Sequence, residues 1–320
     1  MNEIRLGRRQ ALSAALLGVL GCRRTPPVEE QLPAPLTFAA ASASSDAAAP
    51  VLVDDGSLRY VRRELSLPGT LSPRVIALTP DVQSTRFPVV IALHGRGEAR
   101  KGPDIGPLGW PEDYALEQAL LRILTPPLTR ADFYGFIDAQ TLAAHNSALA
   151  ARPFAGLVVL CPYLPDVDLE DAAQQDRYGQ FLVDTLLPHA RAELPILEGR
   201  EHTGIDGISL GGAVALHVGS GFPQAFGAVS GIQPAIQSRH AERWATRLVE
   251  ARERVGDMHL RLQSSEGDPF KPPTRRLSEA LHARTFAHEL TITPGPHDYV
   301  YNRGPAAYGL LTFHDRVLRG

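Results

Sequence analysis

The sequence predicts an α/β fold in which helices cover both faces of a mostly parallel sheet. From about residue 58 onward, short apolar runs alternate with stretches of helical periodicity. The runs at 87–95 and 156–164 are almost continuously apolar, which is typical of strands buried on both faces. Polar and glycine-rich segments follow several of these runs. In sheets of this kind, functional residues gather at the carboxyl ends of the strands.

The individual elements follow from periodicity and turn signals. A turn signal separates two β-rich runs at 58–65 and 73–80, and it predicts an antiparallel pair. Further strands are expected at 87–95, 156–164, 203–209, 225–231, 258–268 and 288–295. Helices are expected at 176–194, 210–221, 274–284 and 306–320.

One segment of the predicted domain, 51–320, is longer than an ordinary connection. Residues 98–153 separate two predicted strands and contain two stretches of helical pattern. We expect them to form a helical insertion, a lid over the carboxyl ends of the strands.

The first 50 residues have the character of an export signal and a tether. A basic start precedes an uncharged, mostly apolar segment at 11–21 that is too short to span a bilayer, as in a signal peptide at 1–22. The end of this segment resembles a bacterial lipobox, which implies lipidation of Cys22, and its start resembles a loose twin-arginine signal. Residues 23–50 are rich in Pro, Ala and Ser and predict a linker. We expect an exported, membrane-anchored lipoprotein in the periplasm or at the cell surface, with a soluble secreted or periplasmic protein as the alternative.

Composition excludes several classes of function. The net charge of −3 provides no basic field for nucleic acid, so membrane contact is expected only through a lipid anchor. Two cysteines make no disulfide framework, and the eleven histidines are scattered without metal-ligand spacing. We therefore expect no metal site.

The segment G-I-S-L-G at 207–211 places a serine between two glycines, after a predicted strand and before a predicted helix. This is the context of a nucleophile elbow, in which Ser209 sits on a strained turn. Side chains at Gly207 and Gly211 would collide with neighbouring backbone in such a turn. Ser209 is therefore the candidate nucleophile.

A nucleophilic serine needs a base and an acid. His297 lies in the loop after the last predicted strand, and Asp268 lies at the end of the strand before it. The order serine, acid, histidine is that of an α/β-hydrolase. Glu266 is the rival acid, whereas Asp298 directly follows the histidine and is badly placed to bond its ring.

An oxyanion hole requires two backbone N–H donors. One is expected from Leu210, directly after the serine, and the other from the loop after the strand at 87–95. The sequence does not separate Gly95 from Arg96 as this second donor. Candidate walls of the substrate pocket are aromatic residues of the insertion and of the histidine loop: Trp110, Tyr114, Phe133 and Tyr299.

Four short motifs now identify a family resemblance. The chain, with ALHGRG, GISLGG, EGDPF and GPHDY, resembles α/β-hydrolases of the esterase type, the group that holds esterase D-like, feruloyl-esterase-like and enterochelin-esterase-like enzymes. The resemblance implies hydrolysis of a small-molecule carboxylic ester through a Ser-His-Asp triad and an acyl-enzyme, without a cofactor. An acyltransferase, a serine peptidase on the same fold and a non-catalytic binding protein are the alternatives. The sequence sets neither the acyl and alcohol parts of the substrate nor the oligomeric state.

Overall fold

A computed structural model describes residues 58–67, 74–82 and 84–319. The predicted signal peptide with Cys22 and the predicted linker at 23–50 lie outside these residues.

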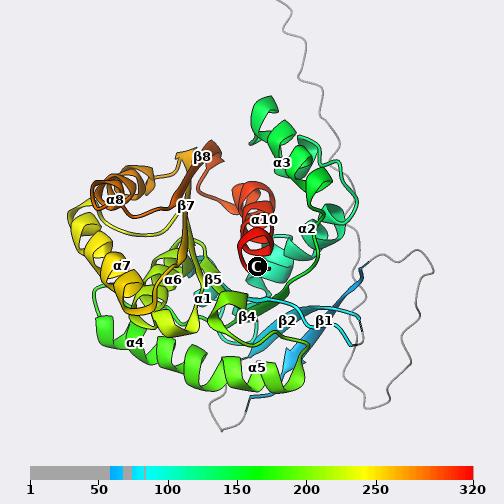
Figure 1. The fold of residues 1–320 in the computed structure, drawn as a ribbon, viewed down its shortest axis with the longest axis horizontal. Coiled ribbons are helices and arrows are strands. Elements are labelled where there is room, and N and C mark those ends of the chain that lie inside the picture. The colour runs from blue at the N-terminus through cyan, green and yellow to red at the C-terminus, as the bar shows by residue number, and fades with distance from the viewer. Residues whose placement is uncertain (1–57, 68–73, 83, 320) are drawn as a thin grey trace, which may run out of the picture. The chain divides into compact units, whose positions relative to one another are not determined.

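The described chain forms an eight-stranded sheet in the order β1-β2-β4-β3-β5-β6-β7-β8 (Figure 1). The strands are β1 (Tyr60–Leu65), β2 (Val75–Pro80), β3 (Val89–Leu93), β4 (Val158–Pro162), β5 (Thr203–Gly207), β6 (Ala228–Ile232), β7 (His259–Gly267) and β8 (Glu289–Pro296). β1 pairs with β2, and β2 with β4, in antiparallel fashion, whereas every pair from β4 onward is parallel. The predicted strands and the predicted antiparallel start are therefore confirmed.

Helices follow most strands. They are α1 (Arg96–Ala99), α2 (Leu116–Ile123), α3 (Ala139–Ala151), α4 (Ala172–Gln180), α5 (Leu187–Glu193), α6 (Leu210–Gly221), α7 (Ala241–Val255), α8 (Lys271–Ala283), α9 (Tyr299–Tyr301) and α10 (Ala307–Val317). The sequence-based prediction missed α7, although its buried Trp244, Leu248 and Ala251 recur at helical spacing. Within the described ranges, no helix has both the length and the apolar character needed to cross a membrane.

The sheet has a separate apolar layer on each face because side chains alternate along each strand. On β3, Val89 and Ile91 pack toward the layer formed by α4 to α8, while Val90 and Ala92 pack toward α2 and α10. Figure 1 shows these two groups of helices on opposite sides of the sheet. Every residue of β3 is buried, as predicted from its continuous apolar run.

The insertion is a layer of the fold more than a lid. α2 buries Leu116, Leu120 and Ile123 in the same apolar cluster as α10, so its apolar stripe holds it against the face of the sheet. The part from α1 to Tyr114 lies beside the carboxyl end of β3, and Phe136 lies against Gly295 near the carboxyl end of β8. The prediction that residues 98–153 as a whole cover the carboxyl ends of the strands is therefore too broad.

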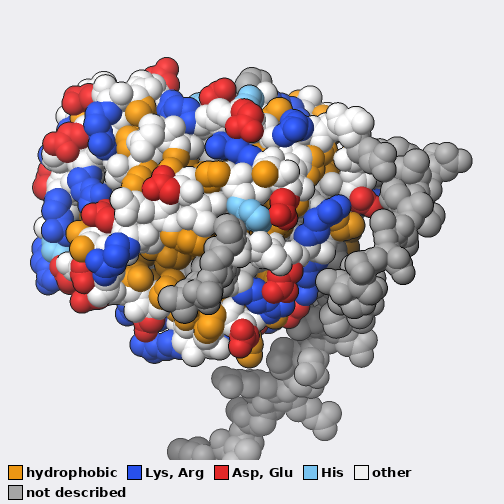
Figure 2. All heavy atoms as spheres, turned by 90° about the horizontal axis from the view of Figure 1, so that it is seen from below, with side chains coloured by type: hydrophobic (Ala, Val, Ile, Leu, Met, Phe, Trp, Pro, Cys, Tyr) orange, Lys and Arg blue, Asp and Glu red, His pale blue; other side chains and the backbone are white. Residues whose placement is uncertain are grey.

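The molecular surface carries both signs of charge. Figure 2 shows basic and acidic side chains interspersed on the face in view, with hydrophobic side chains between them. This mixture agrees with the small net charge of −3.

Candidate active site

Ser209 occupies a strained turn between β5 and α6. Its backbone angles are φ 57° and ψ −114°, and its N–H donates to the Ile232 carbonyl at 3.0 Å. A Cβ atom on Gly207 would lie 2.3 Å from the carbonyl oxygen of Gly211, and one on Gly211 would lie 2.3 Å from that of Leu93. Backbone thus closes on both glycines, which is the steric requirement of a nucleophile elbow.

His297 lies where the chain leaves β8. Its Nε2 is 3.1 Å from Ser209 Oγ, and its Nδ1 is 2.9 Å from Asp268 Oδ1. A carboxylate oxygen can only accept, so Nδ1 carries the ring proton and Nε2 is free to accept the serine proton. The structure brings the three predicted triad residues together in hydrogen-bonding contact.

Asp268 is buried and firmly held. Its carboxylate accepts hydrogen bonds from Ser264 Oγ at 2.5 Å and from the Phe270 N–H at 2.9 Å, besides that of the histidine. The rival acid, Glu266, has a side chain that is 60% exposed and pairs with Lys271 at 2.7 Å. The geometry therefore selects Asp268 as the partner of His297.

Two backbone N–H groups beside Ser209 are unused in the described structure. Leu210 is the first residue of α6 and Arg96 the first of α1, so neither N–H has a partner within its own helix. The Gly95 N–H, in contrast, donates to the Tyr114 hydroxyl at 3.0 Å. Of the two alternatives that the sequence left open, Arg96 is the one whose N–H is available.

His94 holds the segment that follows β3 in place, through hydrogen bonds of both ring nitrogens. Its Nε2 accepts a hydrogen bond from the Leu164 N–H at 3.0 Å, and its Nδ1 lies 3.0 Å from the Gly95 carbonyl oxygen. Burial lowers the pKa of this imidazole, which keeps it neutral and able to accept from Leu164. His94 thereby ties the chain after β4 to the loop that carries Arg96.

Sequence reasoning did not single out Glu98, which bridges two loops of the site. The Tyr299 hydroxyl donates to Glu98 Oε1 at 2.6 Å, and the Tyr114 hydroxyl donates to Oε2. Burial and the nearby carboxylate raise the pKa of both tyrosines, so both remain protonated donors. Because Tyr114 also accepts from the Gly95 N–H, one chain of hydrogen bonds runs from the histidine loop to the Arg96 loop.

Gln233 is a second residue that sequence reasoning missed. It follows β6 with a φ of 44°, and its buried amide Nε2 donates to Ser265 Oγ at 2.8 Å and to the Pro296 carbonyl at 2.9 Å. Pro296 directly precedes His297, so Gln233 supports the backbone that presents the base. A lone Gln after a strand gives no signal of this role, because both partners come from distant segments.

Three of the four predicted pocket walls lie in the core instead. Trp110 is fully buried, Tyr114 is 1% exposed and Phe133 is 2% exposed, because all three pack in the apolar layer that α2 and α10 form with the sheet. Trp110 and Tyr114 have no surface to offer a substrate at the triad. Tyr299 is 39% exposed beside the triad. Phe270, which the sequence did not suggest, packs edge-on against the His297 ring, with 5.4 Å between the ring centroids.

Two further observations complete the description of the site. Beneath the elbow, buried Asp206 forms an ion pair with Arg261 and a hydrogen bond with His314, each at 3.0 Å, and these contacts anchor β5. Among the described residues, no group of three or more His, Cys, Asp or Glu side chains is placed to hold a metal ion.

Comparison with known proteins finds one family model and a set of solved structures with a similar fold. A family model described as "Putative esterase" matches residues 165–301. No curated protein sequence is significantly similar to the chain.

Three solved structures illustrate the likeness of the fold. An S-formylglutathione hydrolase from Staphylococcus aureus is 15% identical, with a TM-score of 0.55 over 83% of this chain and 100% of that chain. A ferulic acid esterase from Anaeromyces mucronatus in complex with ferulic acid is 16% identical, with a TM-score of 0.53 over 84% and 94%. A substrate-bound, fluorophosphonate-binding serine hydrolase from Staphylococcus aureus is 13% identical, with a TM-score of 0.52 over 81% and 99%.

The α/β-hydrolase fold predicted from the sequence is confirmed by these likenesses. The segment that matches the esterase model also contains Ser209, Asp268 and His297. The chain is a hydrolase with serine-esterase character.

Proposed function

We propose that this protein hydrolyses small-molecule carboxylic esters through a Ser209–His297–Asp268 triad and an acyl-enzyme intermediate. The observation that carries the proposal is the continuous hydrogen-bonded series from Ser209 Oγ through the His297 ring to Asp268, with lengths of 3.1 Å and 2.9 Å. Such a series activates a serine hydroxyl that is a weak nucleophile by itself.

In the first half of the reaction, Ser209 Oγ attacks the ester carbonyl carbon while His297 Nε2 accepts the hydroxyl proton. Asp268 stabilises the imidazolium that forms, because its buried carboxylate keeps Nδ1 hydrogen-bonded. The tetrahedral intermediate collapses by breaking the bond to the leaving oxygen. His297 returns the proton to that oxygen, and the alcohol departs.

In the second half, a water molecule repeats the attack on the acyl-enzyme. His297 takes a proton from the water and gives it to Ser209 Oγ as the acyl bond breaks. The products are the free carboxylic acid and the restored serine.

The N–H groups of Leu210 and Arg96 are proposed to stabilise the oxyanion of both intermediates. They stand at the starts of α6 and α1, where backbone donors lack partners within the helix. A donor of this kind typically contributes about 3–4 kcal/mol of transition-state stabilisation. The hydrogen bond between the Gly95 N–H and Tyr114 leaves Arg96 as the second donor.

The substrate class is proposed from the comparisons. The similar solved structures include enzymes described as acting on S-formylglutathione and as ferulic acid esterases. Esters of small acyl groups and of hydroxycinnamic acids therefore make the first panel. Tyr299, which is exposed and lies two residues after His297, and Phe270, whose ring packs against that of His297, are candidate contacts for the substrate.

The direct test is to label the full chain with a fluorophosphonate probe and to identify the modified peptide by mass spectrometry. We expect a single adduct on Ser209 and none in Ser209→Ala, whose turnover of 4-nitrophenyl esters should fall by about 10⁴-fold or more. Full esterase activity in Ser209→Ala would refute the assignment. Absence of an adduct on folded wild-type protein would favour the non-catalytic alternative.

For the location of the protein we propose export and lipidation at Cys22, on the basis of the signal-like segment and the lipobox resemblance. Metabolic labelling with a palmitate analogue in a bacterial host should mark the wild type and leave Cys22→Ser unlabelled. Equal labelling of the two would rule out this anchor.

A further inference from the structure

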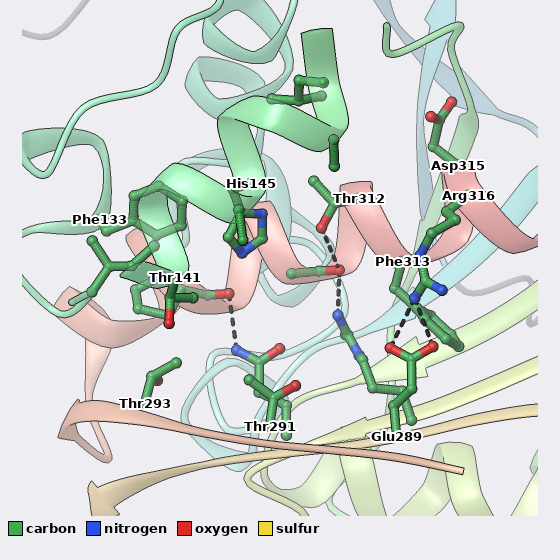
Figure 3. A pocket seen from close by; sticks show the side chains of 18 of the residues that line it. Phe133, Thr141, His145, Glu289, Thr291, Thr293, Thr312, Phe313, Asp315 and Arg316 are labelled. Carbon is green, nitrogen blue, oxygen red and sulfur yellow. Dashed lines mark hydrogen bonds and ion pairs between the residues drawn. The ribbon is translucent and has the colours of Figure 1, made fainter. Parts of the chain in front are cut away.

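A cavity of about 380 Å³ lies outside the triad, between α3, α10 and the last two strands of the sheet (Figure 3). Small-ligand sites have volumes of roughly 300–1,000 Å³, so this one has room for a compact molecule. Within α3, Leu149 is the one buried residue, so this helix forms a wall of the cavity and does not fill it.

The cavity is distinct from the proposed active site. Its lining residues include neither the triad nor Leu210 and Arg96. The two sites share β7, whose Gln263 lines the cavity while the neighbouring Ser264 hydroxyl holds Asp268 on the other face. A ligand in the cavity therefore approaches the sheet beside the catalytic acid without reaching the serine.

The walls are apolar and aromatic with polar groups set among them. Aromatic rings are supplied by Phe133, Phe136, Phe154 and Phe313. Thr291 and Thr293 of β8 and Thr312 of α10 add hydroxyl groups. Figure 3 shows Thr291 and Thr293 on one side of the space and Thr312 on the other, with His145 pointing into it from α3. This is the arrangement of a site that takes a molecule with an apolar body and a few polar atoms.

His145 is the polar group best placed to meet such a molecule. Its ring packs against that of Phe133, with 5.6 Å between the ring centroids, and forms no hydrogen bond with any described residue. Burial, together with the charge of Arg261, lowers the pKa of this imidazole, so it is neutral near pH 7. A neutral imidazole both donates and accepts, which suits an oxygen of a ligand.

The charges around the cavity are paired with one exception. Four charged lining residues belong to three ion pairs: Arg316 with Glu289 at 2.6 Å, Arg261 with Asp206 at 3.0 Å, and Asp315 with Arg319. The Arg152 guanidinium, at the end of α3, donates to the Arg316 carbonyl at 3.3 Å. Arg152 is exposed, and no carboxylate of the described residues lies within ion-pair distance of its guanidinium, although its charge acts on Asp315 at longer range.

We propose that this cavity binds a small monocarboxylate with an aromatic body, whose carboxylate pairs with Arg152 and whose body lies among the phenylalanines near His145. A single unpaired cation calls for a single negative charge, because a second one would meet Glu289 or Asp315. The phenyl-lined volume selects a compact ring over a long chain. The site is independent of the ester hydrolysis proposed above.

The test is calorimetric titration of the full chain with 3-phenylpropanoate, alongside its neutral analogue 3-phenylpropanamide. For the wild type we expect a dissociation constant of about 1 mM or tighter for the acid. The amide should bind about tenfold more weakly because it lacks the charge-assisted contact. Arg152→Gln should weaken binding of the acid about tenfold and leave binding of the amide unchanged.

A cavity-filling variant locates the binding. Ala148 lines the cavity from α3, whereas Ala143, on the same helix, does not. Ala148→Trp should abolish binding of 3-phenylpropanoate, and the matched control Ala143→Trp should retain it, with thermal melts reporting the fold of both. Binding that persists in Ala148→Trp, binding lost equally in both variants, or no binding by the wild type would overturn the proposal. If Ala148→Trp fails to fold, the Arg152→Gln titration decides: binding of 3-phenylpropanoate as tight as in the wild type would overturn the proposal.

Discussion

The nucleophile and the base of this site are held in place by different kinds of contact. The elbow is fixed by backbone: the Ile208 N–H donates to the Leu93 carbonyl at 3.1 Å, and Gly207 and Gly211 touch neighbouring main chain. This arrangement needs no side-chain contact within the elbow. It requires only that Gly207 and Gly211 carry no side chain.

The loops that carry the acid and the base are fixed by side chains from elsewhere. Gln233 holds the carbonyl before His297, Glu98 holds Tyr299 after it, and Ser264 holds Asp268. The elbow thus depends on shape, and the acid–base side depends on individual hydrogen bonds. Substitutions on the two sides should therefore fail in different ways.

The largest effect is expected on the acid–base side. Asp268→Asn keeps the volume of the side chain but presents an amide to Nδ1, which favours the wrong tautomer of His297. We expect kcat for a 4-nitrophenyl ester to fall by about 10⁴-fold. Glu266→Gln, two residues earlier, is the matched control and should stay within about twofold, since exposed ion pairs contribute little. A large loss in the control would return Glu266 to the role of the acid.

The elbow should respond to volume alone. Gly211→Ala introduces a Cβ atom 2.3 Å from the Leu93 carbonyl oxygen. We expect kcat to fall by about 100-fold or more and unfolding in urea to show a loss of about 1–3 kcal/mol. Gly221→Ala, at the other end of α6, meets only Arg247 Nη2 at 3.7 Å and should keep both activity and stability. Equal behaviour of the two variants would contradict a sterically defined elbow.

A smaller effect is expected from Glu98, which acts through the tyrosines it accepts from. Glu98→Ala should lower kcat by about 10–100-fold with little change in KM, because small displacements of catalytic groups are costly. Glu98→Gln retains an acceptor oxygen and should recover part of the rate. The exposed Glu112, replaced by Gln, serves as the control. A change in KM alone would mean that Glu98 contacts the substrate and does not position the loops.

The contrast also explains which features the sequence could reveal. Backbone contact demands glycine at particular positions, and buried strands demand apolar runs, so the elbow and the positions of the strands along the chain were both predictable from local patterns. The spacing of Asp268 and His297 followed from the same strand–helix alternation.

The supporting side chains left no such local trace. Glu98 and Tyr299 lie far apart in the chain, and their contact depends on how two loops fold back over the sheet. Trp110 was misplaced for a related reason: an aromatic residue in a polar segment suits a pocket wall and a core equally, and only the packing of α2 decides between them. α7 was overlooked despite a clear helical pattern, so that omission was avoidable.

The smallest predicted effect concerns His94, which serves the oxyanion side through its hydrogen bond from Leu164. Burial lowers its pKa from the ordinary value of 6.5, so below that pH the unfolded chain binds a proton that the folded protein excludes. The free energy of unfolding should therefore fall as pH drops from about 6.5. His94→Gln can form both hydrogen bonds but does not titrate, so its stability should depend less on pH between 7 and 5, by up to about 1.4 kcal/mol per pH unit.

Urea unfolding at a series of pH values measures this difference directly. Other buried histidines with lowered pKa values, such as His217, contribute equally to both proteins and cancel in the comparison. Identical pH dependence in the two proteins would mean that His94 is protonated without cost in the folded state. Its bond from Leu164 would then be dispensable, and the loop that carries Arg96 would be held by Tyr114 and Glu98 alone.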